Sequence, residues 1–140
     1  MTEIPRQPED PTETESYYAE IVKEIADINI LLQDIEKLLP LAEYNIVVEE
    51  FNIIRQLKAP IEKLKKLREN ILDIINLYSE MRGNIHNLLE EFKKSFPEKD
   101  YNAAMRKFNE LKKRPATLQA LEKFKNILER IIKQKLPLHF

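Results

Sequence analysis

Apolar side chains recur at every third or fourth position over most of this 140-residue chain. The clearest run comprises Tyr18, Ile21, Ile25, Ile28, Leu32, Ile35 and Leu39. This spacing places the side chains on one stripe of an α-helix, and it does not fit the strict alternation of a half-buried strand. The chain has a single glycine, Gly83, whereas β-rich folds need several glycines in their turns. The sequence therefore predicts an all-α fold.

Prolines divide the periodic pattern into five predicted helices, because proline cannot donate the helical hydrogen bond. These helices cover residues 15–39, 41–58, 60–94, 101–114 and 116–136. The third helix is the longest, and it is apolar on most sides over residues 71–78, which predicts a central position. We expect an antiparallel bundle of four to five helices with one long central helix. The sequence leaves open whether the chain folds back or only kinks at Pro40 and at Pro60.

The periodic region predicts one domain over residues 15–136. Before it, residues 1–14 contain three prolines and several acidic residues, which predicts a flexible acidic arm. After it, residues 137–140 form a short apolar tail. The first residues do not resemble a signal peptide, and no apolar run approaches the roughly 18 residues of a membrane span. We therefore expect a cytoplasmic location.

Charge is distributed unevenly along the chain, although the net charge is only −1. Residues 1–54 contain 13 acidic and three basic residues, a net charge of −10. Residues 55–140 contain 11 acidic and 20 basic residues, a net charge of +9. Such an asymmetry indicates charged partners. Attraction between the two halves inside one bundle is the alternative explanation.

Two charged surfaces are the candidate binding sites. The first is basic and would bind nucleic acid or an acidic partner; it comprises Arg106, Lys107, Lys112, Lys113, Arg114, Lys123, Lys125, Arg130 and Lys133. The second is acidic and would bind a basic partner; it comprises Glu9, Asp10, Glu13, Glu15, Glu20 and Glu24. The alternatives are a solvated lysine-rich helix face and an arm that only keeps the protein in solution.

The residue pattern predicts no catalytic centre, no metal site and no cofactor. The chain has no cysteine, and His86 has no second histidine nearby, whereas a metal site needs several converging ligands. No serine has an adjacent base that would activate it as a nucleophile, and no glycine-rich phosphate loop is present. We therefore expect a non-enzymatic protein that binds another macromolecule.

The Ile-, Lys- and Glu-rich helices, the single glycine and the absence of cysteine and tryptophan resemble small all-α proteins of hyperthermophilic archaeal viruses. Over residues 15–136, the chain is similar in size and build to the virion proteins and RNA-polymerase inhibitors of two-tailed archaeal viruses. This resemblance implies a viral regulator that inhibits host transcription by binding RNA polymerase in the host cytoplasm, and it implies no functional residue. The alternative function is a nucleic-acid-binding virion protein or small effector subunit that uses the basic C-terminal helices. An oligomer is a further option, because long apolar seams also pair between chains.

Overall fold

The computed structural model describes residues 11–114 and 116–135. This part of the chain forms five α-helices and no strand: α1 (Pro11–Leu38), α2 (Leu41–Arg55), α3 (Ile61–Ser95), α4 (Glu98–Lys113) and α5 (Leu118–Gln134). The predicted all-α class is confirmed, and α3 is the long central helix. The first ten residues of the predicted arm, Pro115 and the predicted apolar tail lie outside the described residues.

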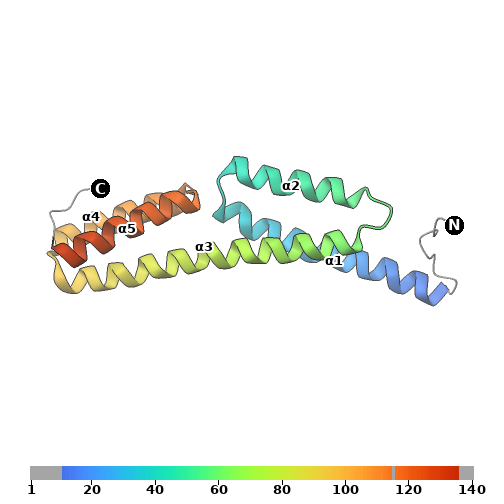
Figure 1. Ribbon diagram of the computed structural model, residues 1–140, viewed down its shortest axis with the longest axis horizontal. Helices are drawn as coiled ribbons and strands as arrows, with labels where there is room; N and C mark the ends of the chain where they lie inside the picture. The colour runs from blue at the N-terminus through green and yellow to red at the C-terminus, as the bar shows by residue number, and fades with distance from the viewer. Residues whose placement is uncertain (1–10, 115, 136–140) are drawn as a thin grey trace.

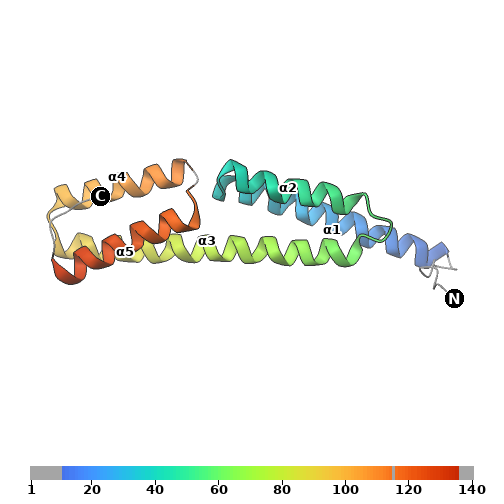
Figure 2. The same ribbon diagram turned by 45° about the horizontal axis from the view of Figure 1, so that its top comes forward.

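Helix α3 runs along most of the molecule and carries one helical hairpin on each half (Figure 1). Helices α1 and α2 pack on its first half, and α4 and α5 pack on its second half (Figure 2). Successive helices run antiparallel, so that α1 and α5 both run parallel to α3. The chain therefore folds back at Pro40 and at Pro60. We call the two halves the N-terminal unit (α1, α2 and the first half of α3) and the C-terminal unit (the second half of α3, α4 and α5).

The predicted seams form the core of each unit. In the N-terminal unit the buried apolar residues are Ile28, Leu32, Ile35, Leu39, Phe51, Ile54, Leu64, Leu67 and Ile71. In the C-terminal unit they are Ile85, Leu89, Phe92, Ala104, Phe108, Leu121, Phe124, Leu128 and Ile131. The rings of Phe108 and Phe124 stack between α4 and α5, with their centroids 6.3 Å apart. Both cores therefore depend on α3, which contributes residues to each.

Proline or threonine precedes four of the five helices. Pro40, Pro60 and Pro97 stand immediately before α2, α3 and α4, where the missing amide proton costs no helical hydrogen bond. Thr117 caps α5, because its hydroxyl oxygen accepts a hydrogen bond from the Ala120 amide at 3.1 Å. The fourth helix was predicted to begin at residue 101, but α4 begins earlier, at Glu98, and Asp100 lies in its first turn. A carboxylate is favourable there because the first turn carries a partial positive charge.

Several helix boundaries and one seam position differ from the prediction. Helix α1 begins at Pro11, so residues 11–14 of the predicted arm are helical, and α5 ends at Gln134 rather than at 136. Tyr18 was predicted to lie on a buried seam, but its side chain is 59% exposed. Leu41, the first residue of α2, is 72% exposed.

Candidate interaction surfaces

The two units meet at a waist around Tyr78, a buried residue midway along α3. Its hydroxyl accepts a hydrogen bond from the backbone amide of Leu118, the first residue of α5, at 3.1 Å. The same hydroxyl donates a hydrogen bond to Oε2 of Glu43 in α2 at 3.3 Å. Burial, and secondly the Glu43 carboxylate, raise the pKa of Tyr78 above its ordinary value of 10.0. The hydroxyl therefore stays protonated at neutral pH and connects a helix of each unit.

A hollow of about 400 Å³ lies beside Tyr78 at the waist. Apolar side chains make up much of its lining, including Leu39, Val47 and Leu77. Glu43 is the single carboxylate among the described residues that line it, and neither a histidine nor a lysine accompanies it. The titratable groups of the hollow are therefore Glu43 and Tyr78, which are hydrogen-bonded to each other.

The remaining chemistry-bearing side chains of α3 do not converge. His86 is exposed, one turn from the half-buried Arg82, whose pKa is lowered from its usual range by burial. Nowhere in residues 11–114 and 116–135 do three or more acidic or histidine side chains come close enough to hold a metal ion. Within the same ranges, no helix has the length and the apolar character needed to cross a membrane.

The basic surface predicted from the sequence lies on α4 and α5 of the C-terminal unit. Its nine members are all exposed except Lys125, which is half-buried and whose Nζ lies 3.6 Å from Oε1 of Glu129. The other eight form no ion pair with a described residue. Their charges therefore remain available to an anionic partner.

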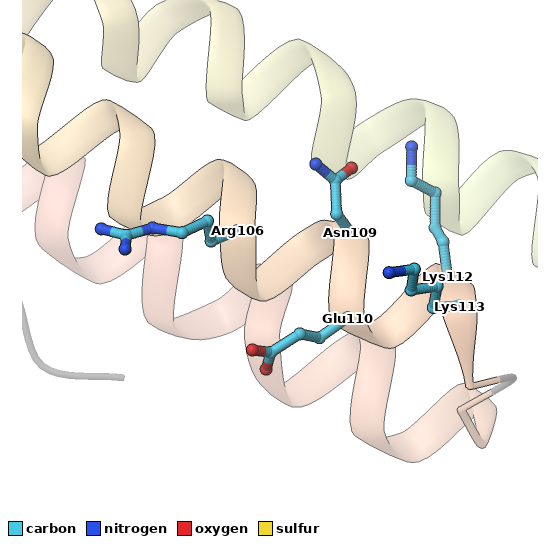
Figure 3. Close-up of a pocket in the computed structure, with 5 residues that line it drawn as sticks. All are labelled: Arg106, Asn109, Glu110, Lys112 and Lys113. Atoms are coloured by element: carbon cyan, nitrogen blue, oxygen red, sulfur yellow. The ribbon is translucent and has the colours of Figure 1, made fainter.

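Part of the basic surface surrounds a shallow hollow of about 620 Å³ on α4. Arg106, Lys112 and Lys113 line this hollow together with Asn109 and Glu110, and all five side chains project from α4 (Figure 3). The Lys112 ammonium also lies 4.6 Å from the centroid of the Phe108 ring, a cation–π distance. Three cations against one carboxylate make this hollow attractive to phosphate groups.

A second part of the basic surface borders the groove between α4 and α5. Lys107 of α4 and Lys123 of α5 both line this groove, which has a volume of about 230 Å³. Leu111, Phe124 and Ile127 contribute the apolar part of its lining. The structure thus brings together two predicted residues that are 16 positions apart in the sequence.

The acidic surface is only partly available for binding. Glu9 and Asp10 lie outside the described residues, and the Glu13 side chain is not described, whereas Glu15 is exposed. Oε1 of Glu20 lies 2.7 Å from Nζ of Lys65, and the bond and charge of Glu20 raise the pKa of Lys65.

Glu24 is less accessible to a binding partner than Glu20. Its side chain is buried, and its Oε2 lies 2.9 Å from Nε of Arg68 in α3. Attraction between the acidic and basic parts of the chain is therefore realised inside the N-terminal unit. Glu20 and Glu24 thus pair with two cations of α3. Among the described side chains of the predicted acidic surface, Glu15 is left exposed and unpaired.

A group of exposed apolar side chains was not predicted from the sequence. The large ones are Tyr18, Val22, Ile30, Leu41, Ile46, Ile53, Leu57, Leu72 and Leu77. All of them lie between residues 18 and 77, and the described residues of α4 and α5 contribute none. A signal was present in the sequence, because several of these residues repeat at helical spacing outside the main seams.

One such set forms the outer face of α2, which we define by Ala42, Ile46, Glu49 and Ile53. These residues follow helical spacing on the side opposite the buried Phe51. Ile46 is 65% exposed and Ile53 is 58% exposed. The outer face of α2 is therefore apolar and carries acidic charge.

Comparisons of the chain with known protein families, with curated proteins and with solved structures gave no match. The fold and the surfaces define an elongated all-α protein whose two ends differ in character. Helices α1 and α2 together contain ten acidic and three basic residues, and they expose apolar side chains. Helices α4 and α5 together contain nine basic and five acidic residues.

Proposed function

We propose that this protein is a non-enzymatic binding protein whose N-terminal unit engages a basic protein partner. The outer face of α2 carries the proposal, because Ile46 and Ile53 expose more than half of their side chains there. Exposed apolar groups that gather on one face mark interaction surfaces in soluble proteins. Glu49 on this face and the neighbouring Glu50 favour a partner in which basic residues flank apolar anchors.

The magnitude of the apolar contribution indicates what else such a partner must supply. Covering the exposed parts of Ile46 and Ile53 contributes about 2–4 kcal/mol, because complete burial of one isoleucine is worth about 1.5–3 kcal/mol. A micromolar complex requires about 8 kcal/mol. The acidic side chains of α1 and α2 must therefore contribute charge contacts, which is why a basic partner fits better than a neutral one.

The specific partner that we propose is RNA polymerase of an archaeal host. The proposal rests on the resemblance to the polymerase inhibitors of two-tailed archaeal viruses, which occupy the DNA-binding channel of the enzyme. A channel that binds DNA presents basic groups. An acidic helical hairpin at the end of an elongated molecule fits such a channel by charge, and the protein would act there as a viral inhibitor of transcription.

Affinity capture from an archaeal host extract, followed by mass spectrometry, tests this function. We expect the full chain to retain RNA polymerase subunits, and the Ile46→Lys/Ile53→Lys variant to lose them. Leu72→Lys is the control, because Leu72 is exposed on α3, outside the outer face of α2. Recovery of no polymerase subunit contradicts the specific partner. Equal recovery with the double variant contradicts the role of α2.

The second candidate function is nucleic-acid binding by the C-terminal unit. The observation that favours it is the hollow bordered by Arg106, Lys112 and Lys113, whose charges no described carboxylate neutralises through an ion pair. Binding to phosphates releases counterions, so each phosphate contact adds about 0.7–0.9 to the slope of log affinity against log salt.

Filter binding across a salt series tests the second candidate. We expect a steep negative salt slope for the natural chain, and a shallower one for Arg106→Glu/Lys113→Glu. Lys66→Glu, an exposed substitution on the first half of α3, is the control that should leave the slope unchanged. Absence of binding at about 50 mM salt contradicts this function, because electrostatic binding is strongest at low ionic strength.

A further inference from the structure

Helix α1 carries a second stripe of side chains on the side opposite its buried seam. Ala19, Val22, Ala26 and Ile30 recur at spacings of three, four and four residues, and all are exposed. Val22 is 65% exposed and Ile30 is 60% exposed. Glu15 extends the same stripe toward the start of α1, and Gln33 and Lys37 extend it toward the end. All three of these residues are exposed as well. We call this set, from Glu15 to Lys37, the α1 outer stripe.

The α1 outer stripe is self-complementary about Ala26. Glu15 lies 11 residues before Ala26 and Lys37 lies 11 residues after it, a distance of about 16 Å along the axis in each direction. Val22 and Ile30 likewise lie four residues on either side of Ala26. A second α1 that lies antiparallel, with Ala26 against Ala26, would therefore place Glu15 beside the partner's Lys37.

In the same arrangement Val22 faces the partner's Ile30, so that the exposed apolar groups of both copies cover each other. Alanine at the centre allows the two helix axes to approach closely, because interaxial distance depends on the side chains at the contact. A parallel arrangement would instead place Glu15 against the partner's Glu15. The antiparallel pair is favoured because it converts two repulsive contacts into two attractive ones.

We propose that this protein forms a symmetric dimer in which the α1 outer stripes of two copies pack antiparallel. The contact is closed, because the same surface serves both copies. It goes beyond the proposed function and uses a different face, since the outer face of α2 and the basic surface take no part in it. The two C-terminal units lie at opposite ends of the dimer, because α1 packs on the first half of α3.

Pairing of the acidic helices of one copy with the basic helices of another is less favourable than this dimer. Glu20 and Glu24 are already paired with Lys65 and Arg68 of their own chain. The described residues of α4 and α5 also expose no large apolar side chain that would cover Val22 or its neighbours. Pairing between opposite ends would be driven by charge alone and would therefore disappear at high salt.

The size of the contact sets its expected strength. Residues 15–37 span about 33 Å of helix, and a helix pair of that length buries on the order of 1,000 Å² in total. This area lies at the low end for specific complexes. We expect a dissociation constant on the order of 10–100 μM.

Sedimentation equilibrium of the full chain between about 1 and 500 μM tests the dimer, since this range brackets the expected dissociation constant. We expect a monomer–dimer equilibrium that persists in about 1 M salt, where charge pairing is screened. Val22→Glu should weaken it at least tenfold, whereas Ile46→Glu should leave it unchanged, although both side chains are 65% exposed. Glu15→Lys should weaken it, and Glu15→Lys/Lys37→Glu should restore it. Circular dichroism establishes that each variant remains helical.

Three results would overturn the proposal. The first is a monomer at every concentration, and the second is a dimer that Val22→Glu leaves intact. The third is a dimer that is lost in about 1 M salt, which identifies pairing between opposite ends instead. The affinity-capture experiment tests the proposed function independently of the dimer, because its substituted residues on α2 lie outside the α1 outer stripe.

Cysteine cross-linking tests the register, because the natural chain contains no cysteine. Ala26→Cys should form an intermolecular disulfide, since a disulfide requires Cα atoms within about 7 Å. Ala19→Cys should not cross-link, because Ala19 faces the partner's Gln33 in the antiparallel register. Ala42→Cys on α2 is the control for random collisions. Efficient cross-linking through Ala19→Cys would indicate parallel helices and would contradict the proposed arrangement.

Discussion

Removal of one hydroxyl at the waist should destabilise the whole molecule. Tyr78→Phe keeps the ring but eliminates the hydrogen bonds to Leu118 and Glu43, which measure 3.1 Å and 3.3 Å. Each such bond contributes about 0.5–1.5 kcal/mol to stability, and the Leu118 amide is left without its acceptor. We therefore expect a loss of about 1–3 kcal/mol in the free energy of unfolding. For a chain of this length, this corresponds to a fall of roughly 3–9 °C in melting temperature.

Urea unfolding followed by circular dichroism measures this loss. Tyr44→Phe in α2 is the control, because Tyr44 is half-buried against the core but its hydroxyl forms no hydrogen bond with the described residues. Hydrogen exchange gives a local measurement, since the Leu118 amide should exchange faster in Tyr78→Phe. A loss no larger than that of Tyr44→Phe, with unchanged exchange at Leu118, would refute the reasoning.

Three other predictions concern the core, the ion pairs and pH. Ile85→Ala, at a fully buried position, should cost about 2–5 kcal/mol, whereas Ile46→Ala should cost less than about 1 kcal/mol in the same urea experiment. Glu24→Gln removes the charge that faces Arg68 in a partly buried ion pair and should cost about 1–3 kcal/mol, whereas Glu20→Gln, at a half-exposed surface pair, should cost less than about 1 kcal/mol. Because the folded state raises the pKa of Tyr78, its contribution to stability is complete below about pH 10 and is lost as pH rises through the raised pKa. The urea midpoint should therefore fall more above about pH 10 in the natural chain than in Tyr78→Phe.

The main seams could be predicted from spacing alone because burial on one helix face depends only on local periodicity. In α5 the four apolar residues that follow this spacing, Leu121, Phe124, Leu128 and Ile131, are all buried. Tyr18 fits the same spacing as the buried residues of α1 but is 59% exposed. Spacing identifies a helix face, but it does not identify which helix covers that face or where the cover ends.

The contacts between helices could not be predicted, because they join residues far apart in the chain. Tyr78 fits the seam of the third predicted helix, yet its partners Glu43 and Leu118 are 35 and 40 residues away. The acidic residue Glu24 was placed in a binding surface, and the structure shows it buried against Arg68. For the basic surface, composition sufficed to find exposed residues, because lysines of an amphipathic helix almost always face solvent.

The shared helix α3 also determines how a force on one end of the molecule is transmitted to the other end. It is the one described helix that belongs to both units, so a bending force on one end reaches the other through a single helical rod and the Tyr78 hydroxyl. Each unit resists bending with three packed helical segments, whereas the two hairpins are joined to each other around Tyr78, midway along α3 (Figure 1). We therefore expect bending to concentrate at this joint, so that each unit keeps its own shape when their relative orientation changes.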